Sequence, residues 1–184
     1  MRVVGGRFRG RTLAGPKSDA IRPTSDRLRE TIFNVLAHGY GDPVEGARVI
    51  DLFAGTGAMG IEALSRGAAF CLFVDEGAQA RGLIRENVES LGLGGATRLF
   101  RRDATRMGAA GQNPPASLVF CDPPYGKDLA PRALKSCADR GWLSPGALVV
   151  VEEAQGSSVA LPFGFEKVER RDYGETTVLF ARYA

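Results

Sequence analysis

Apolar and polar positions beyond residue 44 change their period along the chain in a way that predicts strands and helices in alternation. Strands are expected at 47–53, 69–75, 97–101, 117–121 and 147–152, and helices at 58–65, 77–91 and 128–139. In 77–91 the apolar residues recur three and four positions apart, which is the spacing of one helix face. The runs 117–121 and 147–151 are apolar throughout, as in parallel strands whose two faces are both covered.

The last part of the chain predicts a different pairing. Two strand candidates, 165–172 and 176–183, flank the turn residues Tyr173-Gly174-Glu175 and are expected to form an antiparallel hairpin. Repeated β-α units followed by such a hairpin predict an α/β domain, doubly wound around a mainly parallel sheet of seven strands.

The N-terminal segment follows neither pattern. Residues 2–13 are rich in glycine and arginine, and they predict a short twisted β-hairpin or an extended arm rather than a helix. Further on, Thr24 or Ser25 is a suitable N-cap for an amphipathic helix over 25–38.

Charge is distributed unevenly over the 184 residues, a length that suffices for one domain with its own core. Of the 24 Lys/Arg and 21 Asp/Glu, residues 1–38 carry eight and three, which leaves 16 and 18 for the rest. A basic segment on a nearly neutral body favours contact with a polyanion, although a solvated charged terminus would have the same composition. We therefore expect a basic arm at 1–22 and a single domain at 23–184.

The cysteines and the hydropathy narrow the class of protein. Cys71, Cys121 and Cys137 are odd in number and show no CxxC spacing, so buried reduced thiols and no metal site are expected, as in a cytoplasmic protein. No apolar run approaches the roughly 20 residues of a membrane helix. The first residues also lack the apolar stretch of a secretory signal.

A glycine-rich turn at residues 51–60 follows the first predicted strand and opens a helix. Gly55, Gly57 and Gly60 form a GxGxxG pattern, which would also fit a dinucleotide site or a turn with no ligand at all. Asp51 argues against a bound pyrophosphate, because a carboxylate at the strand end repels phosphates and attracts a cationic ammonium group.

Two further carboxylates close the next strands of the predicted sheet. Asp75 ends the second strand, where an acid can accept hydrogen bonds from ribose hydroxyls. Asp103 follows the third strand, where it can accept from an adenine amino group. An ammonium group, a ribose and an adenine together describe S-adenosylmethionine, which is the cofactor we expect.

The fourth predicted strand runs directly into Asp122-Pro123-Pro124-Tyr125. Ligands of open α/β sheets lie beyond the carboxyl ends of the strands, so this turn and the glycine turn should meet. An exocyclic base amine is a poor nucleophile. The Asp122 carboxylate and the backbone carbonyl of Asp122 or Pro123 would act as acceptors and favour a pyramidal nitrogen that can attack a methyl group. The prolines stiffen the turn, and Tyr125 offers a ring on which an unstacked base can rest. A proline turn that merely closes a strand is the alternative.

With both turns placed, the chain resembles the class I methyltransferases that act on amino groups, which carry an Asp/Asn-Pro-Pro-Phe/Tyr motif. Residues 2–11 and 22–34 are similar to the opening of the bacterial 16S rRNA guanine-N2 methyltransferases, and the Arg-Pro-Thr…Asp-Arg-x-Arg-Glu stretch is the most specific part. Residues 51–67, 122–125 and 141–143 resemble later blocks of that family. The similarity therefore spans nearly the whole chain.

The resemblance implies a Rossmann-like class I methyltransferase fold and methyl transfer to N2 of guanine 966 in 16S rRNA. It implies the 30S subunit or its assembly intermediate as substrate, and we expect the enzyme to act as a monomer. Carried over residue by residue, it places Asp51, Phe53, Ala54, Gly55, Gly57, Asp75, Asp103 and Ala104 at S-adenosylmethionine. It places Asp122, Pro123, Pro124 and Tyr125 at the target base. The expected RNA contacts are Arg7, Phe8, Arg9, Arg11, Arg22 and Arg27.

Two positions depart from the family pattern, and two other functions stay open. Phe8 stands where the family often has Trp, and Asp75 where many members have Glu; both substitutions should preserve the contact. An adenine-N6 methyltransferase uses the same acceptor turn but generally needs a larger target-recognition region than this short arm. A catalytically silent RNA-binding assembly factor would not require both turns intact. Trp142 is expected to pack against the sheet, with RNA stacking as the alternative, and His38 is not expected to act in catalysis.

Overall fold

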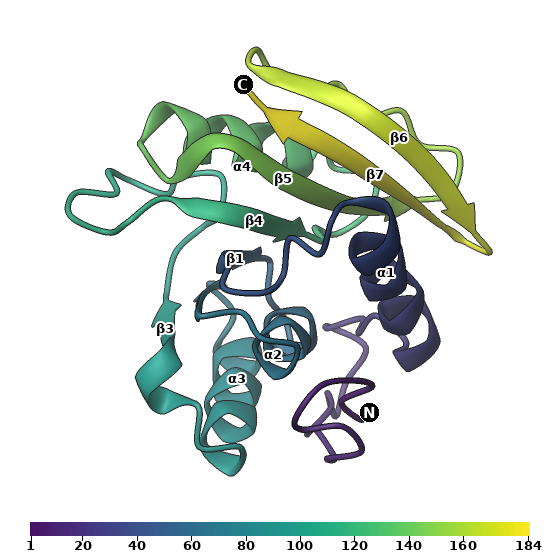
Figure 1. The fold of residues 1–184 in the computed structure, drawn as a ribbon, viewed down its shortest axis with the longest axis vertical. Coiled ribbons are helices and arrows are strands. Elements are labelled where there is room, and N and C mark those ends of the chain that lie inside the picture. Colours follow the sequence, from purple (N-terminus) through teal and green to yellow (C-terminus); the bar gives the residue numbers. More distant parts are fainter.

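The computed structural model describes residues 1–184 and is built around one sheet of seven strands (Figure 1). The strands are β1 (Arg48–Leu52), β2 (Phe70–Val74), β3 (Thr97–Phe100), β4 (Ala116–Cys121), β5 (Leu143–Ala154), β6 (Phe165–Tyr173) and β7 (Thr176–Tyr183). Their order in the sheet is β3-β2-β1-β4-β5-β7-β6. The first five are parallel, whereas β7 runs antiparallel to both β5 and β6. The predicted fold class is confirmed.

Strand β5 is the element whose predicted start is wrong. It begins at Leu143, four residues before the expected 147, because Leu143 already pairs with Ala116 of β4. The register then shifts, and Leu118 pairs with Leu148. The residues between, which include Pro145, form an irregular stretch that tolerates a missing N–H donor, so the apolar pattern alone did not reveal the early start.

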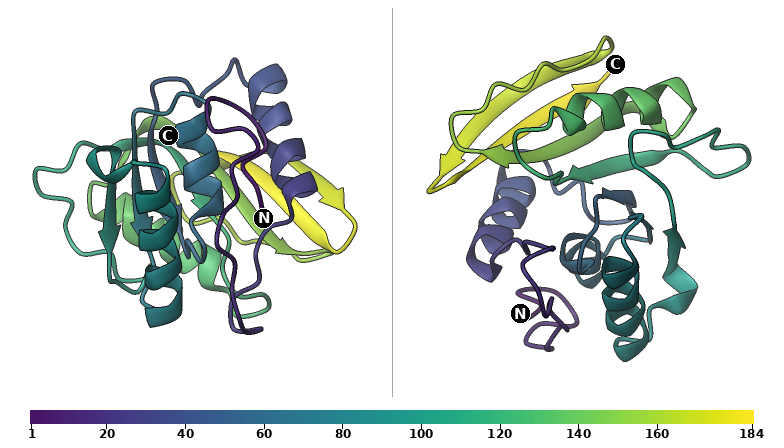
Figure 2. Two further views of the ribbon diagram at one scale, coloured as in Figure 1. Left: turned by 90° about the horizontal axis from the view of Figure 1, so that it is seen from below. Right: turned by 180° about the vertical axis from the view of Figure 1, so that it is seen from behind.

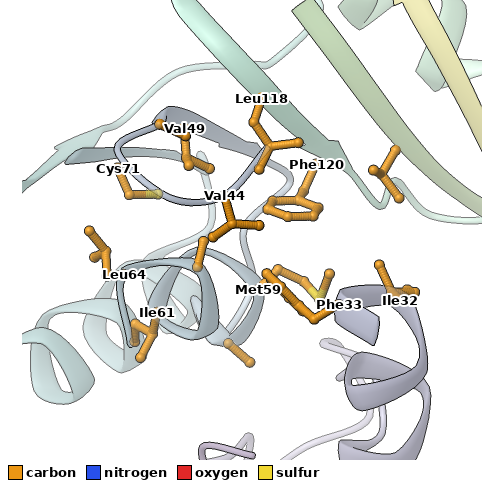
Figure 3. Close-up of a cluster of buried hydrophobic side chains, with 14 of the residues drawn as sticks. Ile32, Phe33, Val44, Val49, Met59, Ile61, Leu64, Cys71, Leu118 and Phe120 are labelled. Carbon is orange, nitrogen blue, oxygen red and sulfur yellow. The ribbon is translucent and has the colours of Figure 1, made fainter. Parts of the chain in front are cut away.

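Helices cover both faces of the sheet (Figures 1 and 2). The helices are α1 (Asp26–Gly39), α2 (Ala58–Ser65), α3 (Ala78–Ser90) and α4 (Leu129–Asp139), with a short 3-10 helix at Gly94–Ala96. Side chains of α1, α2 and α3 share one buried cluster with one face of the sheet, and those of α4 share a second cluster with the other face. Figure 3 shows the first cluster, in which Phe33 of α1 packs against Phe120 of β4 with ring centroids 5.4 Å apart.

The start of α1 assigns different tasks to Thr24 and Ser25. Ser25 is the N-cap, and its hydroxyl accepts from the backbone N–H of Leu28 at 3.1 Å. Such a bond satisfies one of the N–H groups that the first helical turn leaves without a partner. Thr24 is therefore free for another role, and its buried hydroxyl faces Glu152 at the end of β5.

The N-terminal arm is less regular than the predicted hairpin. It contains one antiparallel bridge between Arg2 and Thr12, with backbone hydrogen bonds from Val3 to Arg11 and from Leu13 to Met1, and turns follow between these two short segments. The backbone N–H groups of Val4 and Gly5 donate to the carboxylate of Glu62, which also pairs with the fully buried Arg29. The arm is thus held against α1 and α2 through backbone contacts, and its separation from the domain at residue 22 stays a prediction.

The tip of the arm lies at the end of the domain opposite the carboxyl ends of the strands. Arg7 donates its backbone N–H to Ser65, the last residue of α2, and Arg11 donates to the carbonyl of Ser90, the last residue of α3. In a β-α unit the helix runs back toward the start of the strand, so both anchors mark that far edge. From Ala14, which bonds to Asn87 in α3, the chain returns along the helices toward the other edge.

Five side chains singled out in the sequence lie outside the glycine-rich and acceptor turns. Trp142 is 2% exposed, and its indole N–H donates to Gly108 at 2.8 Å, so it packs in the core and is not free to stack on RNA. All three cysteines are buried and unpaired, as expected. His38 is exposed in the last turn of α1. No helix has the length and apolar character needed to cross a bilayer.

Candidate active site at the ends of β1 and β4

The turn after β1 is built from backbone conformations that favour glycine. Phe53, Gly55 and Gly57 have φ angles of 56°, 62° and 81°, and Gly57 is the N-cap of α2. Gly60 has a different role, because a Cβ there would lie 2.5 Å from both Cys71 and Phe73 of β2. Two glycines therefore shape the turn, and the third lets α2 pack closely on the sheet.

Asp51 supports this turn from inside the protein. It is 2% exposed, and its Oδ2 accepts from the backbone N–H of Gly60 in the first turn of α2 at 3.0 Å. Burial, together with the nearby charges of Asp122 and Asp75, raises the pKa of Asp51 well above its usual value. The structure thus gives Asp51 a helix-capping role that the sequence did not predict, and a direct contact with an ammonium group stays a prediction.

Asp75 and Asp103 lie at the carboxyl ends of β2 and β3, as predicted. Asp75 accepts from the backbone N–H groups of Gly55 and Gly77, each at 2.9 Å, and so ties the glycine turn to β2. One oxygen of Asp103 accepts from the N–H and hydroxyl of Thr105, and these bonds, with the backbone bond as the largest cause, lower the pKa of Asp103. Each carboxylate keeps lone pairs for a ligand.

The remaining residues predicted at the cofactor line the same turns. Phe53 and Ala54 follow β1 directly and are partly exposed. Ala104, which follows Asp103, is only 3% exposed. The assignment of all these residues to the cofactor stays a prediction, but the sheet brings them to one edge.

The acceptor turn, Asp122 to Tyr125, lies beside the glycine turn. Leu52 and Cys121 are register partners in β1 and β4, and the backbone N–H of Asp122 donates to the carbonyl of Leu52 at 3.5 Å. Pro123 is buried and Pro124 exposed. Neighbouring parallel strands therefore bring the two predicted turns together, as the sequence analysis expected.

Arg22 covers the acceptor turn. Its guanidinium carbon lies 3.7 Å from the centre of the Tyr125 ring, and one of its nitrogens donates to the Tyr125 hydroxyl at 2.7 Å. The other terminal nitrogen lies 3.5 Å from Asp122. The hydroxyl of Tyr125 also lies 3.1 Å from that of Thr176 in β7. Among the predicted RNA contacts, Arg22 is thus at the acceptor turn, whereas Arg7, Phe8, Arg9 and Arg11 are at the far edge.

Two buried acids at the end of β5 were missed by the sequence analysis. Glu152 is 4% exposed and lies 3.0 and 3.3 Å from the hydroxyl of Thr24, which is also 3.4 Å from Asp122. Glu153 accepts from the backbone N–H of Gly126 at 3.3 Å. The sequence did contain a signal for these two acids, because both lie at the end of the apolar strand β5, which neighbours β4.

These neighbours shift the titration of the acceptor carboxylate. Burial raises the pKa of Asp122 to about 6, while Arg22, Glu152 and Thr24 oppose that rise. Burial and the charge of Asp122 raise the pKa of Glu152 well above its usual value. Asp122 is therefore the ionised member of the pair near neutral pH and the better hydrogen-bond acceptor.

Comparison with known proteins places the chain in a family. The model of the family described as Conserved hypothetical protein 95 matches residues 1–182. The chain belongs to this family. The family resemblance inferred from the sequence is therefore confirmed.

Other sequences and structures agree with this membership. The chain is 39% identical over 152 residues to Ribosomal RNA small subunit methyltransferase D of Escherichia coli, covering 83% of this chain and 74% of that protein. It is 35% identical over 182 residues to a proposed rRNA methyltransferase of Bacillus subtilis, YlbH, covering 97% and 96%. A solved structure of a proposed Escherichia coli methyltransferase, yhhF, superposes with a TM-score of 0.82 at 31% identity, covering 100% and 97%. The predicted enzyme class, a methyltransferase, is confirmed at the level of the family.

Proposed function

We propose that the protein transfers a methyl group from S-adenosylmethionine to the exocyclic N2 amine of a guanine in small-subunit rRNA. The observation that carries the proposal is the contact between the two turns, in which Asp122 donates its N–H to Leu52 directly before the glycine turn. A methyl donor held at one turn would thus lie beside an amine held at the other. The names of the family relatives support rRNA as the substrate class.

The carboxylates at the strand ends fit the methyl donor by their chemistry. Asp75 has lone pairs left for the ribose hydroxyls after bonding Gly55 and Gly77, and Asp103 has one for the adenine amine. The positive φ angles at Gly55 and Gly57 let the backbone approach the ligand without a Cβ in the way. S-adenosylmethionine supplies a methyl group activated by its sulfonium charge.

The acceptor turn prepares the amine for attack. The carboxylate of Asp122 and the backbone carbonyl of Pro123 offer two acceptors for the two N–H groups of a guanine N2 amine. Bonds to both draw the lone pair out of conjugation with the ring. As the new N–C bond forms, the bond between the methyl carbon and the sulfonium sulfur would break and leave a neutral thioether, and the amine would give up one proton, for which the Asp122 carboxylate is a base at the site. Rigid prolines fix these acceptors in advance, so orientation contributes to the rate.

Tyr125 offers a platform for a guanine that has left its stack, provided that the Arg22 guanidinium moves away from the face of the ring. The guanidinium lies over that face, and 53% of the Arg22 side chain is exposed, so it has room to move. A phosphate next to the target nucleotide is the natural new partner for the displaced cation. Arg22 would then contact RNA as the base enters.

The distant basic tip of the arm favours a large RNA substrate. Arg7, Arg9 and Arg11 are exposed at the end of α2 and α3. Helix α3 has 13 residues, so this tip lies about 20 Å from the cofactor turn at 1.5 Å per residue. Exposed Arg27 in α1 adds a further positive group nearer the acceptor turn. This spread supports the 30S subunit or its assembly intermediate as substrate.

We propose further that the enzyme acts as a monomer in the cytoplasm, where ribosomes assemble. An adenine-N6 methyltransferase would use the same acceptor turn, and the relatives' names favour rRNA over DNA. The test offers labelled S-adenosylmethionine with purified 30S subunits, naked 16S rRNA and duplex DNA as separate acceptors. We expect label in rRNA, recovered as N2-methylguanosine after digestion. Label in adenine or in duplex DNA would overturn the proposal.

A further inference from the structure

Three polar side chains meet behind the acceptor turn. The hydroxyl of Thr24 lies 3.0 and 3.3 Å from the two carboxylate oxygens of Glu152 and 3.4 Å from Oδ2 of Asp122. Thr24 and Glu152 are 8% and 4% exposed, so water does not compensate for a missing hydrogen bond. The polar atoms of Thr24 and Glu152 must therefore find their partners among neighbouring protein groups.

A count of hydrogens shows that the carboxyl groups of Asp122 and Glu152 cannot both be ionised without a cost in free energy. The Thr24 hydroxyl has a single hydrogen, so it can donate to Asp122 or to Glu152 but not to both. With both ionised, one carboxylate oxygen would face the lone pairs of Thr24. A buried negative charge without a donor is costly, so one carboxyl group of the pair has to keep a proton.

The groups that face the pair leave it short of positive charge. Arg22, in the segment before α1, lies 3.5 Å from Asp122. No lysine or histidine pairs with Asp122 or Glu152. Glu153 on β5 and Asp51 on β1 add negative charge near Asp122. Tyr125 and Thr176 bond to each other and carry no charge to offset it.

The position of Arg22 decides which acid keeps the proton. The guanidinium stands on the Asp122 side and stabilises that carboxylate, whereas Glu152 is the more deeply buried of the two. The pKa of Glu152 is accordingly raised well above its usual value, first by burial and then by the charge of Asp122. The pKa of Asp122 is raised only to about 6 by its burial.

We propose that Glu152 is a positioning residue of the acceptor site: it keeps its proton and donates it in a hydrogen bond to Thr24, whose own hydrogen is thereby directed to Asp122. This direction of donation gives Thr24 and Asp122 one donor each and leaves only the carbonyl oxygen of Glu152 without one. It fixes Oδ2 of Asp122 and leaves Oδ1, on the Arg22 side, for the incoming amine. The inference rests on the proposed function, since it names what orients the acceptor of that same reaction.

The acid limb of the single-turnover pH profile distinguishes the two proton positions. Glu152→Gln keeps a neutral donor to Thr24, so we expect a rate within about threefold of wild type and an acid limb that stays in place. If Glu152 instead carried the negative charge, this variant would remove a repelling charge and lower the pKa of Asp122. A limb displaced by about one pH unit or more toward acid would overturn the proposal.

Two variants of Thr24 and one of Glu152 test the direction of the bond. Thr24→Val removes the donor to ionised Asp122, so the rate should fall about ten- to hundredfold and the acid limb should move to higher pH. Thr24→Ser keeps the hydroxyl and should leave the acid limb of the pH profile at the wild-type position. Glu152→Met keeps the bulk of the side chain and loses the hydrogen-bond donor. Its single-turnover rate should lie between those of Thr24→Val and wild type. Glu152→Gln as impaired as Glu152→Met, in proteins with equal thermal unfolding, would contradict a role in donation.

A spectroscopic measurement separates this inference from the proposed function. In the protein labelled with ¹³C at glutamate carboxyl carbons, the signal that is lost in Glu152→Gln identifies Glu152. We expect its chemical shift at pH 7 to be that of a protonated acid, whether or not rRNA is methylated. An ionised Glu152 at pH 7 would overturn the inference even in an active enzyme. A protonated Glu152 in a protein that does not methylate rRNA would leave the inference standing and remove the proposed function.

Discussion

The guanidinium of Arg22 lies 3.7 Å from the centre of the Tyr125 ring, so one side chain already covers the surface that we assign to the target base. The same group donates to the Tyr125 hydroxyl and faces Asp122. A guanine that enters must exchange with this cation. If Tyr125 is the platform of the target base, Arg22 covers it in the free enzyme until RNA offers the guanidinium another partner.

Arg22 should also set the pH at which activity begins. Burial raises the pKa of Asp122 to about 6, and Arg22 opposes that rise. Below this pH we expect the single-turnover rate to fall, because protonated Asp122 no longer accepts a hydrogen bond from the amine. Arg22→Ala removes the cation, raises the pKa of Asp122 in the free enzyme and should shift the fall to higher pH when RNA is subsaturating. Arg22→Lys, which keeps the charge, should shift it less, and a profile unaltered in Arg22→Ala would refute this role.

Loss of Asp75 should weaken the binding of S-adenosylmethionine. The carboxylate is expected to bind the ribose, and it also holds the N–H groups of Gly55 and Gly77. Asp75→Ala should therefore cost about 1.5–3 kcal/mol of binding free energy, measured by calorimetry. Glu76→Ala, at the exposed neighbouring position, is the matched control and should bind as wild type. Equal affinity in a folded Asp75→Ala variant would count against the cofactor assignment.

The arm should contribute to RNA affinity rather than to chemistry. Replacing Arg7, Arg9 and Arg11 by Ala removes up to three phosphate contacts, so the salt dependence of RNA binding should flatten by roughly two to three units of slope. Affinity for S-adenosylmethionine should stay near wild type, because the tip lies far from the cofactor turn.

A second triple variant serves as the control for the arm. Arg106, Arg132 and Arg140 are equally exposed but lie with α4 on the opposite face of the sheet. If the arm is the surface that faces RNA, replacing these three arginines by Ala should leave the salt dependence of RNA binding nearly unchanged. A slope that responds to this control and not to the arm would show that RNA binds on the other face.

Gly60 should tolerate no larger residue. A Cβ at this position would lie 2.5 Å from Cys71 and Phe73, so Gly60→Ala should destabilise the protein by about 1–3 kcal/mol through overpacking. Gly82→Ala on the exposed face of α3 is the control, because nothing lies within 4 Å of a Cβ built at this position. That change should stabilise the protein by about 0.5–1 kcal/mol, as denaturant unfolding can measure.

Much of this architecture could be predicted from local patterns. Apolar strands and helices of regular period alternate, and helix 58–65 was predicted with the bounds that the structure gives. The positions of Asp75, Asp103 and Asp122 followed from one physical rule, since the ends of parallel strands meet at one edge. A rule of that kind needs only the order of elements and no knowledge of side-chain contacts.

Contacts between distant segments could not be predicted in the same way. Thr24 and Ser25 are both good N-caps, and only the position of Glu152, 128 residues later, shows why Ser25 caps the helix and Thr24 does not. The stacking of Arg22 on Tyr125 likewise joins a loop to a turn about a hundred residues away. Pro145 concealed the start of β5, because an irregular pairing allowed the strand to begin before the apolar run.

The rate of methyl transfer by Asp122→Ala tests the central claim most directly. With radiolabelled S-adenosylmethionine and saturating 30S subunits, the single-turnover rate should fall by orders of magnitude, because the acceptor acts mainly in the transition state. The affinities for S-adenosylmethionine and for RNA, measured on the same samples, should stay within a few fold of wild type. A folded Asp122→Ala protein that methylates rRNA at a rate close to wild type would contradict the account.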